Sequence, residues 1–153
     1  MSTALPPATA PSADLAGLFA AQSRFFQRGK TRDLRFRQDS LTALGDVIRR
    51  RQDDLLDALA ADLGKPRLEA YLAEVYFVLA EIQMAVKQLP SWAKPRRVGS
   101  PFFQWPARSE IRREPLGCAV VLAPWNYPAQ LSLSPLIGAV AGGNCVMLKP
   151  SEL

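Results

Sequence analysis

Residues 118–148 decide the fold class, and their sequence is CAVVLAPWNYPAQLSLSPLIGAVAGGNCVML. Cys118–Ala123 is a continuous apolar run rich in β-branched residues, which predicts a parallel strand covered on both faces. Ala129–Ala141 predicts a helix with Pro128 at its first position, and Cys145–Leu148 predicts a second buried strand. A strand, a helix and a strand in this length make a βαβ unit, for which a right-handed crossover is expected.

The same region raises the question of a membrane. No charged residue occurs from Gly117 to Leu148, and a stretch of this length is long enough to span a bilayer. Prolines and amide side chains interrupt it, however, and at bilayer depth they would leave polar groups unpaired. The favoured interpretation is that this segment forms the buried core of a soluble protein. We therefore expect no membrane partner. The opening MSTALPPATAPSADL has no basic segment followed by an apolar core, so we expect a cytoplasmic location.

Upstream of this unit the apolar residues recur with helical spacing. Asp14–Gln27 predicts a first helix. Ser40–Leu63 predicts a second one, because its large aliphatic residues recur at intervals of three, four or seven and form one stripe. Ser40 or Asp39 is suited to cap the start of this second helix, and Gly64 is suited to end it in a left-handed conformation.

A third helix carries the strongest periodic signal in the chain. Its apolar residues alternate spacings of four and three: Leu68, Leu72, Val75, Leu79, Ile82, Val86 and Leu89. This seam predicts one long helix that Pro90 stops. The pattern suits either a coiled-coil dimer or a helix packed against its neighbour, Ser40–Leu63. Because the seam covers only about three heptads, packing against the neighbour is favoured.

The chain therefore divides into four parts. Residues 1–13 are rich in Pro, Ala, Ser and Thr and are expected to form a flexible tail. Residues 14–92 form the helical segment, residues 93–116 a linker, and residues 117–153 the start of the βαβ domain. Within the linker, Ala107–Pro115 has charges at alternating or adjacent positions, which indicates an exposed strand.

The composition excludes several classes of function. The 153 residues are 48% hydrophobic and 22% charged, which is typical of a soluble globular protein. The basic clusters Arg49–Arg51 and Lys94–Arg97 come without a motif that reads nucleic acid, so no such partner is expected. The chain has no histidine, and its two cysteines, Cys118 and Cys145, lie in apolar runs. Neither a metal site nor a disulfide framework is expected.

The functional site is expected at one edge of the βαβ unit. Ligands of open α/β sheets gather at the carboxyl ends of the strands, which here are Pro124–Tyr127 and Lys149–Glu152. The usual dinucleotide fingerprint, GxGxxG, does not follow the first strand. The pair Gly142-Gly143 lies at the far end of the helix and is more simply a turn.

The segment from Glu114 to Leu153 resembles the opening of the cofactor domain of the aldehyde dehydrogenase superfamily. Two motifs carry the resemblance: the Pro-Trp-Asn-Tyr-Pro turn at 124–128, and Gly-Asn-x-Val-x-Leu-Lys-Pro-Ser-Glu at 143–152. DLGKPRLEAYLAEV (62–75) and WAKPRRV (92–98) are similar to the class 3 branch, which includes fatty and aromatic aldehyde dehydrogenases. The resemblance implies an incomplete α/β fold, with N-terminal helices followed by the first βαβ unit of a Rossmann-like, NAD(P)-binding domain.

The resemblance also implies a reaction, the oxidation of aldehydes to carboxylic acids through a cysteine thioester, with NAD or NADP as cofactor. In the family, the asparagine of the turn donates its side-chain amide to the oxyanion of the thiohemiacetal, and Asn126 matches that position. A neutral donor aimed where negative charge develops stabilises such a step. From the residues alone, Asn126 serves equally well as a cap for the helix that begins near Pro128.

Further roles follow from the resemblance in the same way. Lys149 and Glu152 match residues that hydrogen-bond the hydroxyls of the adenosine ribose, since an ammonium and a carboxylate supply donors and acceptors for a diol. A carboxylate there repels a 2′-phosphate, which favours NAD over NADP. Pro124 and Trp125 fall on positions whose backbone lines the nicotinamide end of the cofactor site. Tyr127 falls near the substrate channel, although an aromatic residue beside a turn is also typical of plain packing.

Two parts of the reaction have no match in the chain. The nucleophilic cysteine and the general-base glutamate of the family come from later sequence, and Cys118 and Cys145 match apolar strand positions, where buried thiols are inert. We therefore expect a fragment of a homo-oligomeric enzyme, with a dimer favoured and no metal bound. The alternatives are a non-catalytic helical module that docks to a full-length homologue, and a gene-fragment product without a function of its own.

Overall fold

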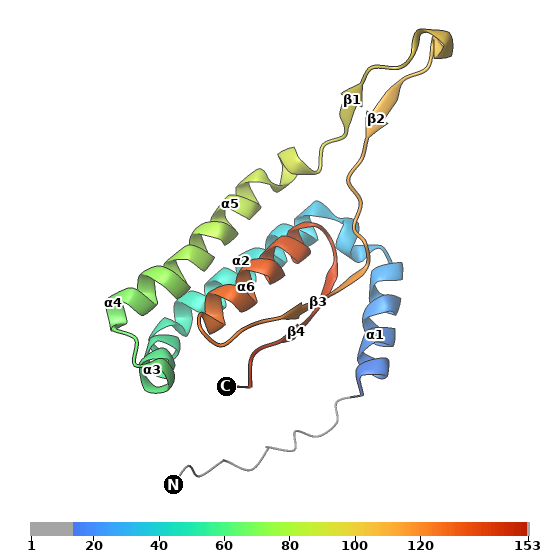
Figure 1. Cartoon of the computed structure of the whole chain (residues 1–153). Helices are drawn as coiled ribbons and strands as arrows, with labels where there is room; N and C mark the ends of the chain where they lie inside the picture. The colour runs from blue at the N-terminus through green and yellow to red at the C-terminus, as the bar shows by residue number, and fades with distance from the viewer. Residues whose placement is uncertain (1–13, 153) are drawn as a thin grey trace.

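The computed structural model describes residues 14–152, so the expected tail, residues 1–13, lies outside the described residues. Helices dominate the N-terminal part, a hairpin projects from the body, and the parallel strand pair comes last (Figure 1). The elements are α1 (Leu15–Gln27), η1 (Lys30–Arg32), α2 (Leu34–Arg50), α3 (Gln52–Leu63), α4 (Arg67–Ala70), η2 (Tyr71–Tyr76), α5 (Phe77–Trp92), β1 (Arg96–Val98), η3 (Phe102–Gln104), β2 (Ser109–Ile111), β3 (Cys118–Leu122), α6 (Pro128–Ala141) and β4 (Cys145–Lys149).

The predicted βαβ unit is confirmed. β3 and β4 are parallel neighbours that pair in register along their whole lengths. α6 connects them, begins at Pro128 as predicted and packs on both strands. The expectation that both faces of the strands are covered is wrong for the described residues, since Val120 and Leu122 are 58% and 73% exposed. The physical reason is that α6 covers one face, while α1 contacts the strands only near their first residues, at Cys118, Cys145 and Val146.

The second helix starts earlier than predicted. α2 begins at Leu34, and its cap is Asp33, whose carboxylate accepts a hydrogen bond from the backbone N–H of Arg35 (2.8 Å). The predicted caps, Asp39 and Ser40, lie inside the helix, where the Ser40 hydroxyl donates to the carbonyl of Phe36 (2.6 Å). A serine hydroxyl can bond a carbonyl of its own helix in this way in the interior of the helix. The prediction that Ser40 or Asp39 caps the helix is therefore wrong.

The predicted single helix Ser40–Leu63 is also divided in two. Arg51 leaves the helical conformation, with φ −105° and ψ 16°, and α3 continues in a new direction from Gln52. The bend brings Leu56 and Leu59 of α3 into the same core as α2. The predicted end is confirmed, because Gly64 caps α3 with φ 62°.

Pro90 does not stop the third helix, contrary to the prediction. α5 continues through it to Trp92. A proline inside a helix lacks the N–H that would bond the carbonyl four residues earlier, which here is Val86. The side chain of Gln38 on α2 donates to that carbonyl instead (2.9 Å). A hydrogen bond from a neighbouring helix thus satisfies the acceptor that Pro90 leaves open.

The third helix is not uniform either. Between α4 and α5 the segment η2 has π-helical geometry, in which the backbone hydrogen bonds span five residues where those of an α-helix span four. The extra residue shifts the buried face upstream of it. Leu68 and Leu72 of the predicted seam are 70% and 47% exposed, whereas Ala70 and Glu74 are buried. The downstream part of the seam keeps its predicted position from Val75 onward.

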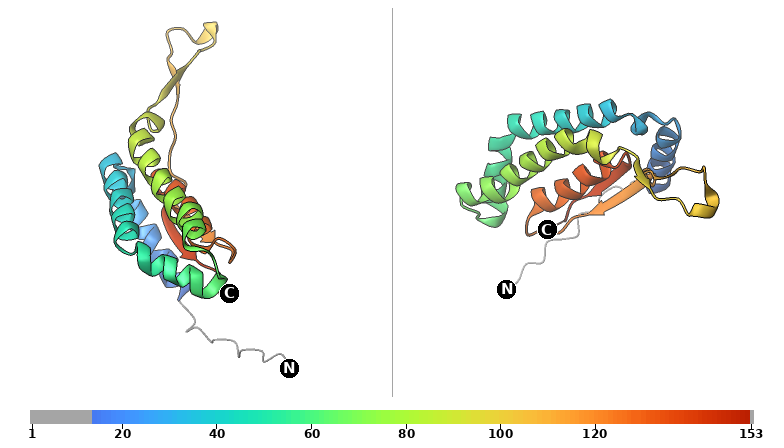
Figure 2. Two further views of the ribbon diagram at one scale, coloured as in Figure 1. Left: turned by 90° about the vertical axis from the view of Figure 1, so that its left-hand side faces the viewer. Right: turned by 90° about the horizontal axis from the view of Figure 1, so that it is seen from above.

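One hydrophobic core joins the helical segment to the βαβ unit. α5 packs against α2, as predicted, and both pack against α6. Figure 2 shows α2, α5 and α6 in successive rows, with β3 and β4 beyond α6. The buried members of this core are Leu41, Ile48, Leu56, Leu59, Ala70, Val75, Val78, Ile82, Ala85, Leu89, Ile137 and Ala141. The site at the ends of β3 and β4 is therefore held by contacts from the N-terminal helices.

The segment between α5 and β3 is a hairpin that projects from the body (Figure 2). The predicted exposed strand is confirmed at Ser109–Ile111, and it pairs antiparallel with Arg96–Val98, a strand that the sequence did not predict. Of the helices between residues 14 and 152, none combines the length and the apolar character that crossing a bilayer requires.

Candidate functional site

The two strand ends chosen from the sequence lie side by side. Leu122 pairs with Lys149, and the backbone N–H of Ala123 donates to the carbonyl of Lys149 (3.1 Å). The turn 124–127 and the segment 149–152 therefore leave the same edge of the sheet. The structure thus brings all six predicted site residues to one place.

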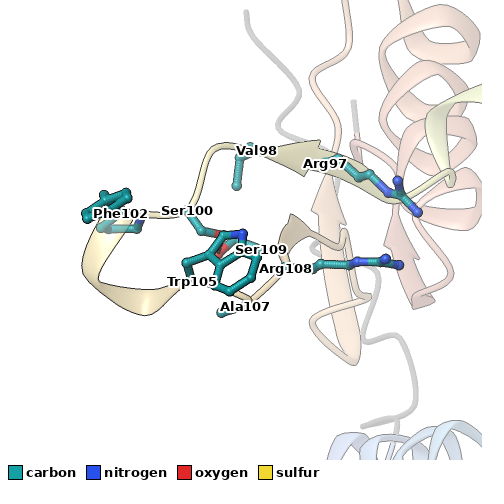
Figure 3. Close-up of a pocket in the computed structure, with 9 residues that line it drawn as sticks. Arg97, Val98, Ser100, Phe102, Trp105, Ala107, Arg108 and Ser109 are labelled. Atoms are coloured by element: carbon teal, nitrogen blue, oxygen red, sulfur yellow. Dashed lines mark hydrogen bonds between the residues drawn. The ribbon is translucent and has the colours of Figure 1, made fainter.

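An open cavity of about 440 Å³ adjoins this edge. Its wall is formed by α3, by the first turns of α6 and by the residues after β4, and it is mainly apolar. Trp125 lines it from the turn, and Pro150 and Ser151 line it from the other strand end. A second cavity, of about 520 Å³, lies in the projecting hairpin and is lined by Arg97, Phe102, Trp105 and Arg108 among others (Figure 3). No predicted site residue lines the hairpin cavity.

Asn126 is exposed at the carboxyl end of β3, between the strand and α6. The alternative role as a helix cap is wrong, because α6 begins at Pro128 and its N-cap is Tyr127, whose side chain makes no capping hydrogen bond. Asn126 therefore lies outside the helix. Its amide group is presented at the sheet edge where ligands of α/β folds bind.

Glu74 supplies the missing cap from a distant element. Its carboxylate accepts hydrogen bonds from the backbone N–H groups of Ala129 (2.8 Å) and Gln130 (3.3 Å), in the first turn of α6. The Glu74 side chain is 0% exposed, and it forms an ion pair with the ammonium of Lys65. A negative charge at the positive end of a helix is favourable, and here it also satisfies backbone donors that no local side chain bonds.

Lys65 continues this network into the turn. Its Nζ atom donates to the backbone carbonyl of Asn126 (2.9 Å) and lies 3.8 Å from the centroid of the Tyr127 ring. Lys65 and Glu74 are functional residues that the sequence alone did not predict. The available signal is the segment 62–75, which contains both of them and carries the resemblance to the class 3 branch.

Lys149 and Glu152 form an exposed ion pair after β4, with the ammonium nitrogen 2.7 Å from a carboxylate oxygen. The hydrogen bond from Lys149, together with its positive charge, holds the pKa of Glu152 below its ordinary value. The two groups therefore offer adjacent donors and acceptors at the sheet edge. This donor set fits the hydroxyls of a ribose ring, and nothing in its charges favours a metal ion.

The two cysteines lie at the opposite edge of the sheet. Cys118 and Cys145 are register partners at the first residue of each strand, roughly 13 Å from the site edge by strand rise. They are half-buried, so the expectation of fully buried thiols is wrong. Burial and then the neighbouring Cys118 raise the pKa of Cys145, which disfavours its thiolate at neutral pH. Neither thiol is placed to react at the Asn126 turn.

Comparison with known proteins agrees with this geometry. Residues 4–153 match the model of the aldehyde dehydrogenase family, and the chain belongs to that family. It is 42% identical over 135 residues to a 4,4′-diaponeurosporen-aldehyde dehydrogenase of Staphylococcus aureus, a match that covers 88% of this chain and 29% of that protein. Aldehyde dehydrogenase family 3 member B1 of Mus musculus is 41% identical, over 84% of this chain and 27% of its own length. The predicted similarity to the class 3 branch is confirmed.

Solved structures give the same fold. The substrate-bound Staphylococcus aureus AldH superposes with a TM-score of 0.88 at 41% identity, covering 90% of this chain and 30% of that one. A glyceraldehyde-3-phosphate dehydrogenase, GapN, from Methanocaldococcus jannaschii has the same fold, with a TM-score of 0.77 at 23% identity over 89% of this chain and 28% of that one. That structure is a complex with NADP. The chain thus spans somewhat less than a third of the length of these relatives.

Proposed function

We propose that this chain contributes the N-terminal helices and the first βαβ unit to an NAD(P)-dependent aldehyde dehydrogenase that converts aldehydes to carboxylic acids. The observation that carries the proposal is the exposed Asn126, presented at the sheet edge beside Lys149 and Glu152 and not used as a helix cap. The sequence relatives named as aldehyde dehydrogenases support it. The cytoplasm remains the expected compartment.

Asn126 is proposed to stabilise the oxyanion. A cysteine thiolate from outside this chain attacks the carbonyl carbon of the aldehyde, and the carbonyl oxygen takes up the negative charge. The side-chain N–H of Asn126 donates to that oxygen, which is favourable because the donor is neutral and fixed before the reaction. Loss of a hydride from the substrate carbon to NAD(P)+ would convert this adduct to a thioester, and water activated by a glutamate, again outside this chain, would release the acid and restore the thiol.

The cofactor is proposed to bind through the residues after β4. NAD(P)+, when bound, accepts the hydride that leaves the substrate carbon. Lys149 and Glu152 would hold the ribose hydroxyls, and the turn backbone at Pro124 and Trp125 would line the nicotinamide end. The Glu152 carboxylate stays ionised beside Lys149 and repels a 2′-phosphate, which supports NAD as the preferred cofactor. Tyr127 is proposed to line the substrate channel.

The test of this function is a substitution at the turn. A chimera in which residues 14–152 replace the matching segment of the staphylococcal relative supplies the remaining catalytic groups. Asn126→Ala is expected to lower its turnover about a hundredfold with little change in cofactor affinity. Gln83→Ala, on an exposed position of α5, is the matched control. An Asn126→Ala chimera with the turnover of the control would contradict the proposal.

The chain by itself is expected to reduce no NAD with any aldehyde, because Cys145 is held as a thiol and both cysteines lie at the wrong edge of the sheet. Activity of the isolated chain that disappears on mutating Cys118 or Cys145 would contradict this assignment. An inactive chain that bound tightly to a full-length homologue would favour the interaction-module alternative.

The enzyme is also proposed to be a homo-oligomer, most simply a dimer. The supporting observation is the tip of the projecting hairpin, where Phe102, Phe103 and Trp105 are 94%, 83% and 82% exposed. Apolar side chains so exposed are typical of an interface with a partner. Replacing all three by serine in the chimera is expected to convert the dimer to a monomer in sedimentation velocity. A triple variant that remains a dimer would exclude the hairpin tip as the interface.

A further inference from the structure

A buried ion pair ties the N-terminal helices to the proposed oxyanion turn. Glu74 comes from the π-helical segment η2, and Lys65 follows the C-terminal cap of α3. Their side chains are 0% and 12% exposed. Neither residue belongs to the βαβ unit, yet both bond to it directly.

The contacts of this pair hold the backbone from Asn126 to the first turn of α6. Lys65 donates to the backbone carbonyl of Asn126 and lies over the ring of Tyr127. Glu74 accepts the N–H groups of Ala129 and Gln130, the first free donors of α6. The backbone is therefore held at Asn126 and again three residues later, while the Asn126 side chain stays exposed.

A purely structural cap would not require this arrangement. Helices are usually capped by a Ser, Thr, Asp or Asn at the N-cap position, and here that position is Tyr127. The capping carboxylate comes instead from 55 residues earlier in the chain and is buried with an ammonium. Buried ion pairs add little stability compared with apolar side chains, but they impose one geometry on their partners.

We propose that Lys65 and Glu74 are positioning residues that aim the Asn126 amide at the oxyanion. This inference rests on the proposed function of Asn126. The two residues touch neither the substrate nor the reacting atoms. They act through the turn, because a donor misplaced by about 1 Å loses much of its effect on the transition state.

A double-substitution cycle tests the proposal in the chimera described above. Lys65→Met is expected to lower turnover about tenfold, with unchanged cofactor affinity. In the Asn126→Ala background the same substitution is expected to have no further effect, because the group that it positions is gone. Lys87→Met, at an exposed lysine of α5, is the matched control and should behave like the parent in both backgrounds. An equal loss from Lys65→Met in both backgrounds would overturn the proposal.

A second measurement uses the chain itself and does not depend on activity. In Lys65→Met and Glu74→Gln, the NMR order parameters of the Asn126 backbone and side-chain amides are expected to fall, and the Ala129 and Gln130 amides to exchange faster with water. Unchanged order at Asn126 in a folded variant would overturn the proposal. If Asn126→Ala alone left turnover intact, the proposed function would fail, whereas the order parameters would still report on the positioning.

Discussion

The carboxylate of Glu152 is a proposed cofactor-binding group whose ionisation depends on its neighbour, Lys149. It is fully exposed, and the hydrogen bond and charge of Lys149 lower its pKa. A depressed pKa means that the ion pair is intact above the ordinary pKa of a glutamate and is lost as the pH falls through the lowered value. The ribose-binding form proposed for this pair is therefore present throughout the neutral range.

A carboxyl titration by NMR checks this effect. The midpoint for Glu152 in the chain is expected below that of an unperturbed glutamate, and Lys149→Met is expected to return it to the ordinary value. A midpoint unaffected by Lys149→Met would mean that the ion pair does not form in solution.

The sequence alone located some of the candidate site residues and not others. The six residues of the two motifs were placed correctly at one edge, because parallel strands end together whatever follows them. Lys65 and Glu74 were missed because their contacts with the turn cross 61 and 55 residues of chain. No local pattern encodes such a contact, since it depends on how α3 and η2 pack against α6.

In the helix α5, a neighbouring helix supplies a hydrogen bond that the helix itself cannot make. Pro90 removes a donor, and Gln38 of α2 restores the hydrogen bond to Val86. Gln38→Ala is expected to lower the free energy of unfolding by about 1 kcal/mol, since the Val86 carbonyl would lose its partner. Gln88→Ala, at an exposed position of α5, is expected to have no comparable effect. Urea denaturation of the chain measures both, and equal effects would contradict the role of Gln38.

The helix α6 is bonded at each end by a buried charged side chain whose charge is opposite to that end of the helix dipole. Glu74 lies at its N-terminus, and the guanidinium of Arg37 donates to the carbonyl of Ala141 at its C-terminus (3.2 Å). The same guanidinium donates to the carbonyls of Thr31 (2.5 Å) and Arg32 (3.1 Å). Each charge opposes the helix dipole at its own end, which is the favourable arrangement.

Removing the second of these groups is expected to be costly. Arg37→Met leaves three buried or half-buried carbonyls without a donor, so the free energy of unfolding should fall by about 3 kcal/mol. Arg35→Met, at an exposed position of the same helix, should change it by less than about 0.5 kcal/mol. Chemical denaturation distinguishes the two, and a mild effect of Arg37→Met would contradict its anchoring role.

The sequence predicted most elements of the helical segment but not their interruptions. Apolar spacing locates a buried stripe, and it continues across Arg51 and through η2 without a glycine or proline to mark a change. Both interruptions are determined by packing, which turns α3 toward the core and buries Glu74. The strand β1 was missed for a related reason: it has three residues, and all of them are exposed.

The molecule as a whole behaves as one packed unit with a projecting arm. Because α2, α5 and α6 share a core, the two sides of the hairpin are joined by tertiary contacts as well as by the chain. Chymotrypsin is expected to cut first at Phe102, Phe103 or Trp105, which are the most exposed aromatic residues of the arm.

The nicked chain is then expected to remain together. Both pieces should elute as one species in native gel filtration and separate only in denaturant, since the core contacts cross the cut. Immediate separation of the pieces in native buffer would show that the helical segment and the βαβ unit are independent.

The π-helical turn has a consequence for which changes of chain length the protein can tolerate. The segment 71–76 contains one residue more than an α-helix would need to join its two ends in register. Deleting Leu72 or Ala73 would let a regular helix join Arg67–Ala70 to α5, so that both flanks could keep their orientation and Glu74 its partner Lys65. Deleting a residue inside α5, where the helix is regular, would instead turn one flank by about 100° relative to the other. We therefore expect a one-residue deletion to be tolerated better in the π-helical turn than in α5.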